Sequence, residues 1–145
     1  MTRTILLIFA LIIQGCAHIS EKSSLYSEFM EYRESVEGST LLENYTKYFD
    51  PALTSDIDLT DSSTVSQLEF SKMMAEEVQY FELVSKTKGC LTVNGKGVES
   101  NPIAFYIEYK YINEKWLIAD IDVSFLENPE DYAKKALCPS EIRIN

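Results

Sequence analysis

The feature that most constrains the fold of this 145-residue chain is a change of hydrophobic period near residue 82. From Leu25 to Val36, apolar residues recur at the helical spacing i, i+4, i+7 and i+11, and Gly38 follows. From Ala104 to Ile112 they alternate with polar residues, as in a half-buried strand. Helices followed by an antiparallel meander predict an α+β domain, with N-terminal helices packed on a curved antiparallel sheet.

Spacing and turn signals predict the other elements. The expected helices cover residues 41–49, residues 66–81 from a capping box at Ser66–Glu69 (or from Thr64–Gln67), and a short stretch after Asn128. A loop is expected over residues 50–63, strands over residues 82–87 and 90–93, and a turn at Asn94-Gly95.

A closing hairpin is expected, with a two-residue turn at Asn113-Glu114 and a last strand over residues 115–125. In the register that this turn sets, the facing pairs are Tyr111–Trp116, Tyr109–Ile118 and Ile107–Asp120. The last strand then carries apolar residues on both faces. Either both faces are covered, or a β-bulge near Ala119 re-phases the strand.

The N-terminal segment has the pattern of an export signal. Only Arg3 carries a side-chain charge ahead of an apolar run over residues 5–13, which is too short for the roughly 20 residues of a spanning helix. The sequence Ile13-Gln14-Gly15-Cys16 resembles the bacterial lipobox. The resemblance implies cleavage before Cys16 and acylation of that residue. An ordinary cleaved signal peptide is the alternative.

The lipobox resemblance implies three parts: a signal peptide (1–15), a lipidated tether (16–24) and one α+β domain (25–145). The mature chain is then attached to the membrane through its N-terminal lipid. In bacterial lipoproteins, Asp directly after the lipidated cysteine resembles an inner-membrane retention signal. This chain has Ala17 at that position, so the resemblance implies an outer-membrane location with the domain facing the periplasm. An extended tether holds that domain within roughly 27 Å of the bilayer.

The charge of the chain excludes some partners. It has 23 acidic and 13 basic residues and a net charge of −10, which becomes −11 without residues 1–15, because they contain Arg3 and no acid. Such a chain is repelled by nucleic acid. The acids form no EF-hand loop, and the single histidine, His18, lies beside the lipidation site, so we expect no metal site.

Two cysteines remain once Cys16 carries lipid. An even pair in an exported protein, here Cys90 and Cys138, predicts a disulfide. Two separate buried thiols are the alternative, because sequence alone does not bring the sulfurs together.

The residues Tyr109–Ile121 are similar to the closing hairpin of NTF2-like (cystatin-like) domains. In that family an alternating strand, a short polar turn, Lys-Trp and a second alternating strand often end the sheet. The resemblance implies a cone in which helices cover a curved sheet. Because the family includes enzymes, accessory subunits and binding modules, it does not decide the function.

Two groups of residues are candidates for a site. Aromatic residues on the predicted strands could line a ligand pocket, or form the sheet's core: Tyr106, Tyr109, Tyr111 and Trp116. Asp120 and Asp122, with Tyr109 or Tyr111, are the candidates for a general base, and a solvent-facing strand edge is the alternative for these two acids.

The chain contains no Ser/His/Asp set, P-loop or zinc-protease motif, so we expect no catalytic residue and no cofactor. We therefore expect a non-catalytic binding or accessory role in the bacterial cell envelope, with an envelope protein or a small apolar ligand as partner. The alternatives are an NTF2-like protein that binds a small ligand in an aromatic pocket, and an envelope enzyme that uses Asp120 or Asp122.

Overall fold

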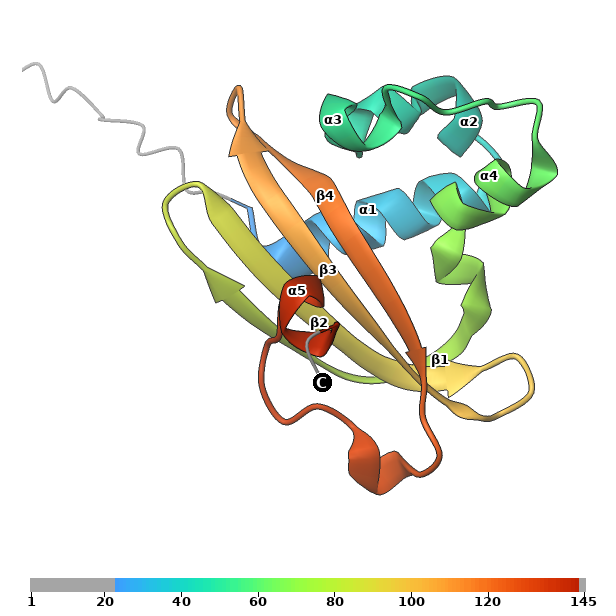
Figure 1. The fold of residues 1–145 in the computed structure, drawn as a ribbon, viewed down its shortest axis with the longest axis vertical. Coiled ribbons are helices and arrows are strands. Elements are labelled where there is room, and N and C mark those ends of the chain that lie inside the picture. Colours follow the sequence, from blue (N-terminus) through green and yellow to red (C-terminus); the bar gives the residue numbers. More distant parts are fainter. Residues whose placement is uncertain (1–22, 144–145) are drawn as a thin grey trace, which may run out of the picture.

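A four-stranded antiparallel sheet with most of the helices on one face forms the centre of the protein (Figure 1). The computed structural model describes residues 23–143. The strands lie in the order β1 (Met74–Val84), β2 (Lys88–Gly97), β3 (Pro102–Ile112) and β4 (Lys115–Phe125). The helices are α1 (Leu25–Glu37), α2 (Leu41–Asn44), η1 (Tyr45–Lys47), α3 (Pro51–Thr54), α4 (Ser62–Leu68), η2 (Phe70–Met73), η3 (Pro129–Asp131) and α5 (Pro139–Ile142). The predicted α+β class is confirmed.

Helix α1 forms where the helical period predicts it. The Ser24 hydroxyl caps it by accepting the Ser27 N–H at 3.1 Å, and Gly38 ends it. The predicted stripe from Leu25 to Val36 is buried against the sheet, with Phe29 and Tyr32 fully covered. This packing supplies most of the stability of α1, because an isolated helix of this length is marginal in water.

The predicted helix over residues 66–81 is helical only as far as Met73, in α4 and η2, and is wrong from Met74 onward. Helix α4 starts earlier, because the Asp61 carboxylate accepts the Ser63 N–H at 2.9 Å, and it ends at Leu68. From Met74 the chain is strand β1, where pairing with β2 overrides the helical spacing of the apolar residues. Residues 50–63 also include helix α3 and are not all loop.

The predicted turn at Asn94-Gly95 is also wrong, since both residues lie inside β2. Each has a packing role there instead. Asn94 is fully buried, and its side-chain amide donates to the Ala133 carbonyl at 2.8 Å. A Cβ atom at Gly95 would lie 2.4 Å from the Glu76 carbonyl oxygen, so only glycine lets β1 approach so closely.

The closing hairpin has the predicted turn, and its predicted pairing holds from the turn as far as a one-residue bulge at Ala119. Asn113 and Glu114 have φ angles of 49° and 64°, as the central residues of a type I′ turn require. The pairs Tyr111–Trp116 and Tyr109–Ile118 form as predicted, but Ile107 faces Ile121 and not Asp120. Ala119 has no partner in the register, so it forms a β-bulge. A bulge near this residue was one of the two explanations for the apolar residues on both faces of the last strand. The bulge turns Ile121 and Val123 toward the helices, where both pack on the core.

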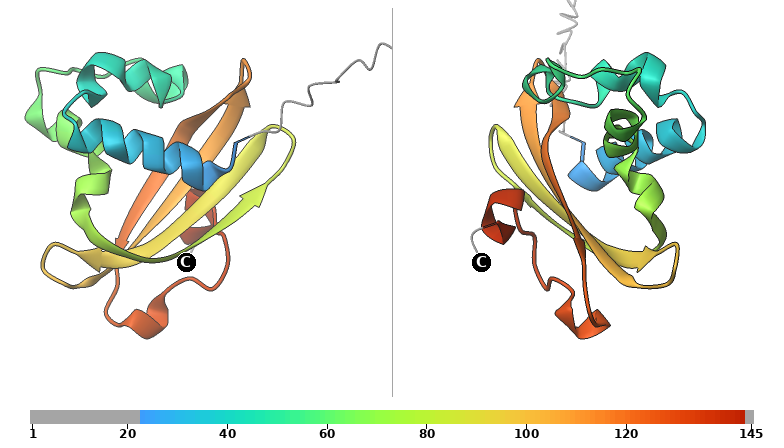
Figure 2. Two further views of the ribbon diagram at one scale, coloured as in Figure 1. Left: turned by 180° about the vertical axis from the view of Figure 1, so that it is seen from behind. Right: turned by 45° about the vertical axis from the view of Figure 1, so that its right-hand side comes forward.

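The other face of the sheet is covered by residues 126–143, which we call the C-terminal strap. Figure 2 shows helices α1 to α4 on one side of the sheet and α5 on the other. A second apolar cluster fills the space beneath the strap: Ala104, Tyr106 and Ala133, with Leu126, Leu137 and Ile142 around them. Both explanations for the two apolar faces of β4 therefore hold, because the strand is bulged and covered on each side.

Candidate functional site

An apolar pocket of about 290 Å³ lies between α3, α4, η2 and β4. This volume is at the lower end of the range for small-molecule sites. The lining side chains are Phe49, Leu53, Ile57, Thr64, Gln67, Leu68, Phe70, Met73, Asp120, Ile121 and Val123. The pocket is thus built from the short helices between α1 and β1, and from the part of β4 that follows the bulge.

Main-chain pairing with β4 holds one wall of the pocket in place. The Asp50 N–H donates to the Ile118 carbonyl, and the Ile118 N–H donates to the Tyr48 carbonyl, both at 2.8 Å. Phe49, between these two residues, is fully buried at the base of the pocket. The Asp50 carboxylate accepts the Ala52 N–H at 3.0 Å and so caps α3, which carries Leu53.

A buried tyrosine fixes the opposite wall. The Tyr32 hydroxyl donates to the Leu68 carbonyl at 2.7 Å and accepts the Ser71 N–H at 3.4 Å. Burial raises the pKa of this phenol well above its usual value, so it remains a neutral donor. The junction of α4 and η2 is therefore tied to α1, and Phe70 beside it stacks on Tyr32 with ring centroids 5.0 Å apart.

Two apolar side chains at the pocket remain open to solvent. Leu53 is 38% exposed and Met73 is 36% exposed, whereas Leu68 and Phe70 beneath them are 4% and 2% exposed. A covered base below partly exposed apolar side chains suits a small apolar group, because such a group would remove the exposed carbon from water.

The one acidic side chain at the pocket, Asp120, is held by the C-terminal strap. Its two oxygens accept from the Arg143 guanidinium at 2.9 and 3.0 Å, and Oδ1 also accepts the Ile121 N–H at 2.9 Å. Asp122 accepts from the same arginine at 3.3 Å. These hydrogen bonds, chiefly those to Asp120, raise the pKa of Arg143. Hydrogen bonds to Arg143 thus already occupy oxygens of both carboxylates.

The four aromatic residues selected from the sequence lie on two different sides of the sheet, and none lines the pocket. Tyr109 and Trp116 are in the main core, 1% and 2% exposed, and Tyr111 packs on Trp116 with ring centroids 4.9 Å apart. Tyr106 faces the strap. Burial raises the pKa of Tyr109 well above its usual value.

Of the candidates selected from the sequence, only Asp120 lines the pocket, and sequence reasoning missed the apolar residues around it. Leu53 and Ile57 lie in the segment expected as a loop, and Met73 ends the short helix η2, where the sequence predicted the middle of a longer helix. The run of apolar residues between Phe49 and Met73 was a signal, but it has no single period that would place these side chains together.

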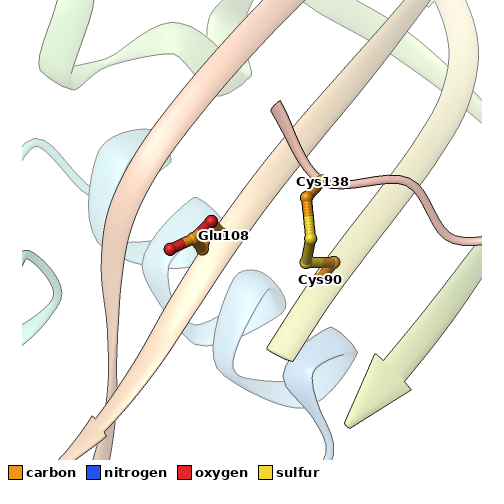
Figure 3. Close-up of side chains that lie close together, drawn as sticks. All are labelled: Cys90, Glu108 and Cys138. Atoms are coloured by element: carbon orange, nitrogen blue, oxygen red, sulfur yellow. A yellow bond between two sulfur atoms is a disulfide. The ribbon is translucent and has the colours of Figure 1, made fainter. Parts of the chain in front are cut away.

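Cys90 and Cys138 form the predicted disulfide, with Cα atoms 5.1 Å apart (Figure 3). The Glu108 carboxylate lies beside it, and the sulfur and oxygen atoms are within 4.8 Å of one another. Sulfurs that are bonded to each other do not act as thiolate ligands, and Glu108 is paired with Lys88 at 2.8 Å. The disulfide therefore holds the strap to the sheet, and the three residues leave no donor set for a metal in this state.

Three residues of β2 that face the strap bind it at successive points. Cys90 bonds to Cys138, and the Thr92 hydroxyl accepts the Leu137 N–H at 2.9 Å. Asn94 donates to the Ala133 carbonyl. Because Thr92 and Asn94 are fully buried, losing the strap would leave polar groups without these partners.

Comparisons with protein-family models, curated protein sequences and solved structures gave no match. The predicted signal peptide, the lipidation site Cys16 and most of the tether lie outside the described residues. From residue 23 to residue 143, no helix has the length and apolar character needed to cross a membrane.

Proposed function

We propose that this protein is a membrane-anchored periplasmic lipoprotein with a non-catalytic binding role in the bacterial cell envelope, and that its pocket takes a small apolar group. The observation that carries the proposal is the pocket itself. Apolar side chains line most of it, Leu53 and Met73 are partly exposed, and its acid is paired with Arg143. Such a site supports binding better than proton transfer.

The anchor is supported by the lipobox pattern that ends at Cys16. The acidic net charge agrees with a role away from nucleic acid. Cys16→Ser should move the protein from the membrane fraction to the soluble periplasmic fraction. Unchanged membrane retention would refute lipidation at that residue.

The NTF2-like cone is our proposal for the finer fold. The Tyr109–Ile121 hairpin supports it, and so does a curved sheet with most of the helices on one face. The strap and its disulfide lie outside the usual pattern of that family. The envelope-enzyme alternative has less support, because Arg143 binds both Asp120 and Asp122.

Binding of the neutral fluorescent probe N-phenyl-1-naphthylamine tests the pocket. Leu53 lines the pocket and Leu59 does not, yet the two side chains are 38% and 37% exposed, so they form a matched pair. We expect the probe to gain fluorescence with the parent protein. Leu53→Ser should weaken binding about fivefold, which corresponds to about 1 kcal/mol of lost apolar contact.

Leu59→Ser should bind the probe like the parent protein. Absence of binding to the parent protein, or equal weakening by both substitutions, would contradict the proposal for the pocket. Crosslinking in cells tests the accessory role separately, because it recovers an envelope protein only if one is bound.

A further inference from the structure

The outer edge of β1 is an apolar strand edge. β1 is 11 residues long and lies at one end of the sheet, and among residues 23–143 no strand pairs with its outer side. Tyr80, Leu83 and Val84 are 44%, 66% and 46% exposed, and Phe81 is half-buried. An edge of this kind is a template for another strand.

The hydrogen-bonding pattern shows which residues face outward. The Ser85 N–H donates to the Lys88 carbonyl, and the register from residue 79 to residue 84 has no shift. In an antiparallel ladder, hydrogen-bonded and non-hydrogen-bonded pairs alternate. Gln79, Phe81 and Leu83 therefore bond to β2, whereas Tyr80, Glu82 and Val84 direct their N–H and C=O groups toward the outer edge.

We propose that the outer edge of β1 pairs antiparallel with the same edge of a second copy of this chain, about a two-fold axis at Phe81. In this register Phe81 lies opposite Phe81 of the second copy, in a non-hydrogen-bonded pair. Tyr80 lies opposite Glu82 of the second copy, and their main chains exchange hydrogen bonds. The two sheets become one continuous sheet.

Charge disfavours one neighbouring register, and the register shift in β1 disfavours the other. An axis at Glu82 would place two glutamates directly opposite each other, which is unfavourable. An axis at Tyr80 would bring the paired segment into the register shift between Glu77 and Gln79. The axis at Phe81 avoids the glutamate pair, keeps the paired residues 79–83 clear of the shift and places an aromatic pair at the centre.

Two of the acidic side chains near the edge are already held by this chain, and the one that pairs with a lysine adds less repulsion between two acidic chains. Glu76 pairs with Lys96 at 3.0 Å, and the Glu82 carboxylate accepts the Tyr26 N–H at 3.1 Å. The Tyr26 ring stacks on Tyr80 with centroids 3.8 Å apart, so Tyr80 is held in place before pairing. A side chain fixed in advance loses less entropy on association.

Crosslinking by introduced cysteines tests both the dimer and its register. The parent is the full chain with Cys16→Ser, in which Cys90 and Cys138 are bonded to each other. Under mild oxidation, Phe81→Cys should form a disulfide-linked dimer, because the two positions face each other across the axis. Leu83→Cys should not, because four residues along the strand separate its two positions by about 13 Å, and a disulfide needs Cα atoms within about 7 Å.

Sedimentation equilibrium of the parent protein provides a second measurement that needs no substitution at the edge. A mass of two chains together with crosslinking at Phe81→Cys alone supports the proposal. A monomer at high micromolar concentration overturns it. Equal crosslinking by Phe81→Cys and Leu83→Cys also overturns it, since random collision would then explain the bond.

Discussion

Reducing the Cys90–Cys138 disulfide should lower the free energy of unfolding by about 4 kcal/mol. The bond joins residues 48 apart, and it encloses β3 and β4. In the chain-entropy model, a loop of this length restricts the unfolded chain by about 14 cal/mol/K, or about 4 kcal/mol at 25 °C. The reduced protein also loses the covalent hold on the C-terminal strap, so the strap's hydrogen bonds to Thr92 and Asn94 would weaken with it.

Urea denaturation of the Cys16→Ser chain, followed by tryptophan fluorescence, measures this difference. Trp116 is 2% exposed, so its emission reports loss of the main core. Thr92→Val is the matched control, because it removes strap hydrogen bonds and leaves the disulfide intact. It should cost about 1 kcal/mol. A difference below about 1 kcal/mol between oxidised and reduced protein would refute the reasoning, because the bond would then not restrict the unfolded chain.

Three further predictions follow from single side chains. The Ala52 N–H, and after it Lys110, lower the pKa of Asp50, so this group's stabilisation is present above its unfolded pKa and is lost as the pH falls through the lower folded pKa. The free energy of unfolding in urea should therefore fall more below about pH 4 in the parent protein than in Asp50→Asn. Glu114→Gly should raise the melting temperature, because Glu114 has a φ of 64° and glycine adopts this left-handed conformation without the steric cost of roughly 1–2 kcal/mol that a side chain carries there. A lower melting temperature would contradict the turn assignment. Tyr32→Phe should destabilise by about 1–3 kcal/mol in urea, since it removes the hydroxyl that bonds the Leu68 carbonyl, and an unchanged midpoint would exclude that role.

Local signals predicted the parts of the fold that depend on local structure. The stripe from Leu25 to Val36 gave α1, and alternation with Asn113-Glu114 gave β3, β4 and their turn. The same reasoning failed at β1 and at Asn94-Gly95 because tertiary contacts decide both. β1 pairs along β2, and Asn94 serves the strap.

The candidate site was less predictable than the fold. Most of its residues come from the segment between Phe49 and Met73 and the rest from β4, and the sequence period in that segment does not show which side chains converge. The aromatic residues on the strands attracted attention because they are large and regularly spaced. That regular spacing instead places Tyr109 and Trp116 in the core, while Tyr106 faces the strap. The cysteine pair was predictable, because few cysteines leave few pairings.

The most direct test of the proposed envelope role is the mass of the N-terminal peptide from the protein isolated in its own membrane fraction. We expect a peptide that begins at Cys16 and carries a diacylglyceryl group and an amide-linked acyl chain. A peptide that retains residues 1–15, or one that begins elsewhere with an unmodified Cys16, would contradict the proposal that this domain works as a lipid-anchored protein.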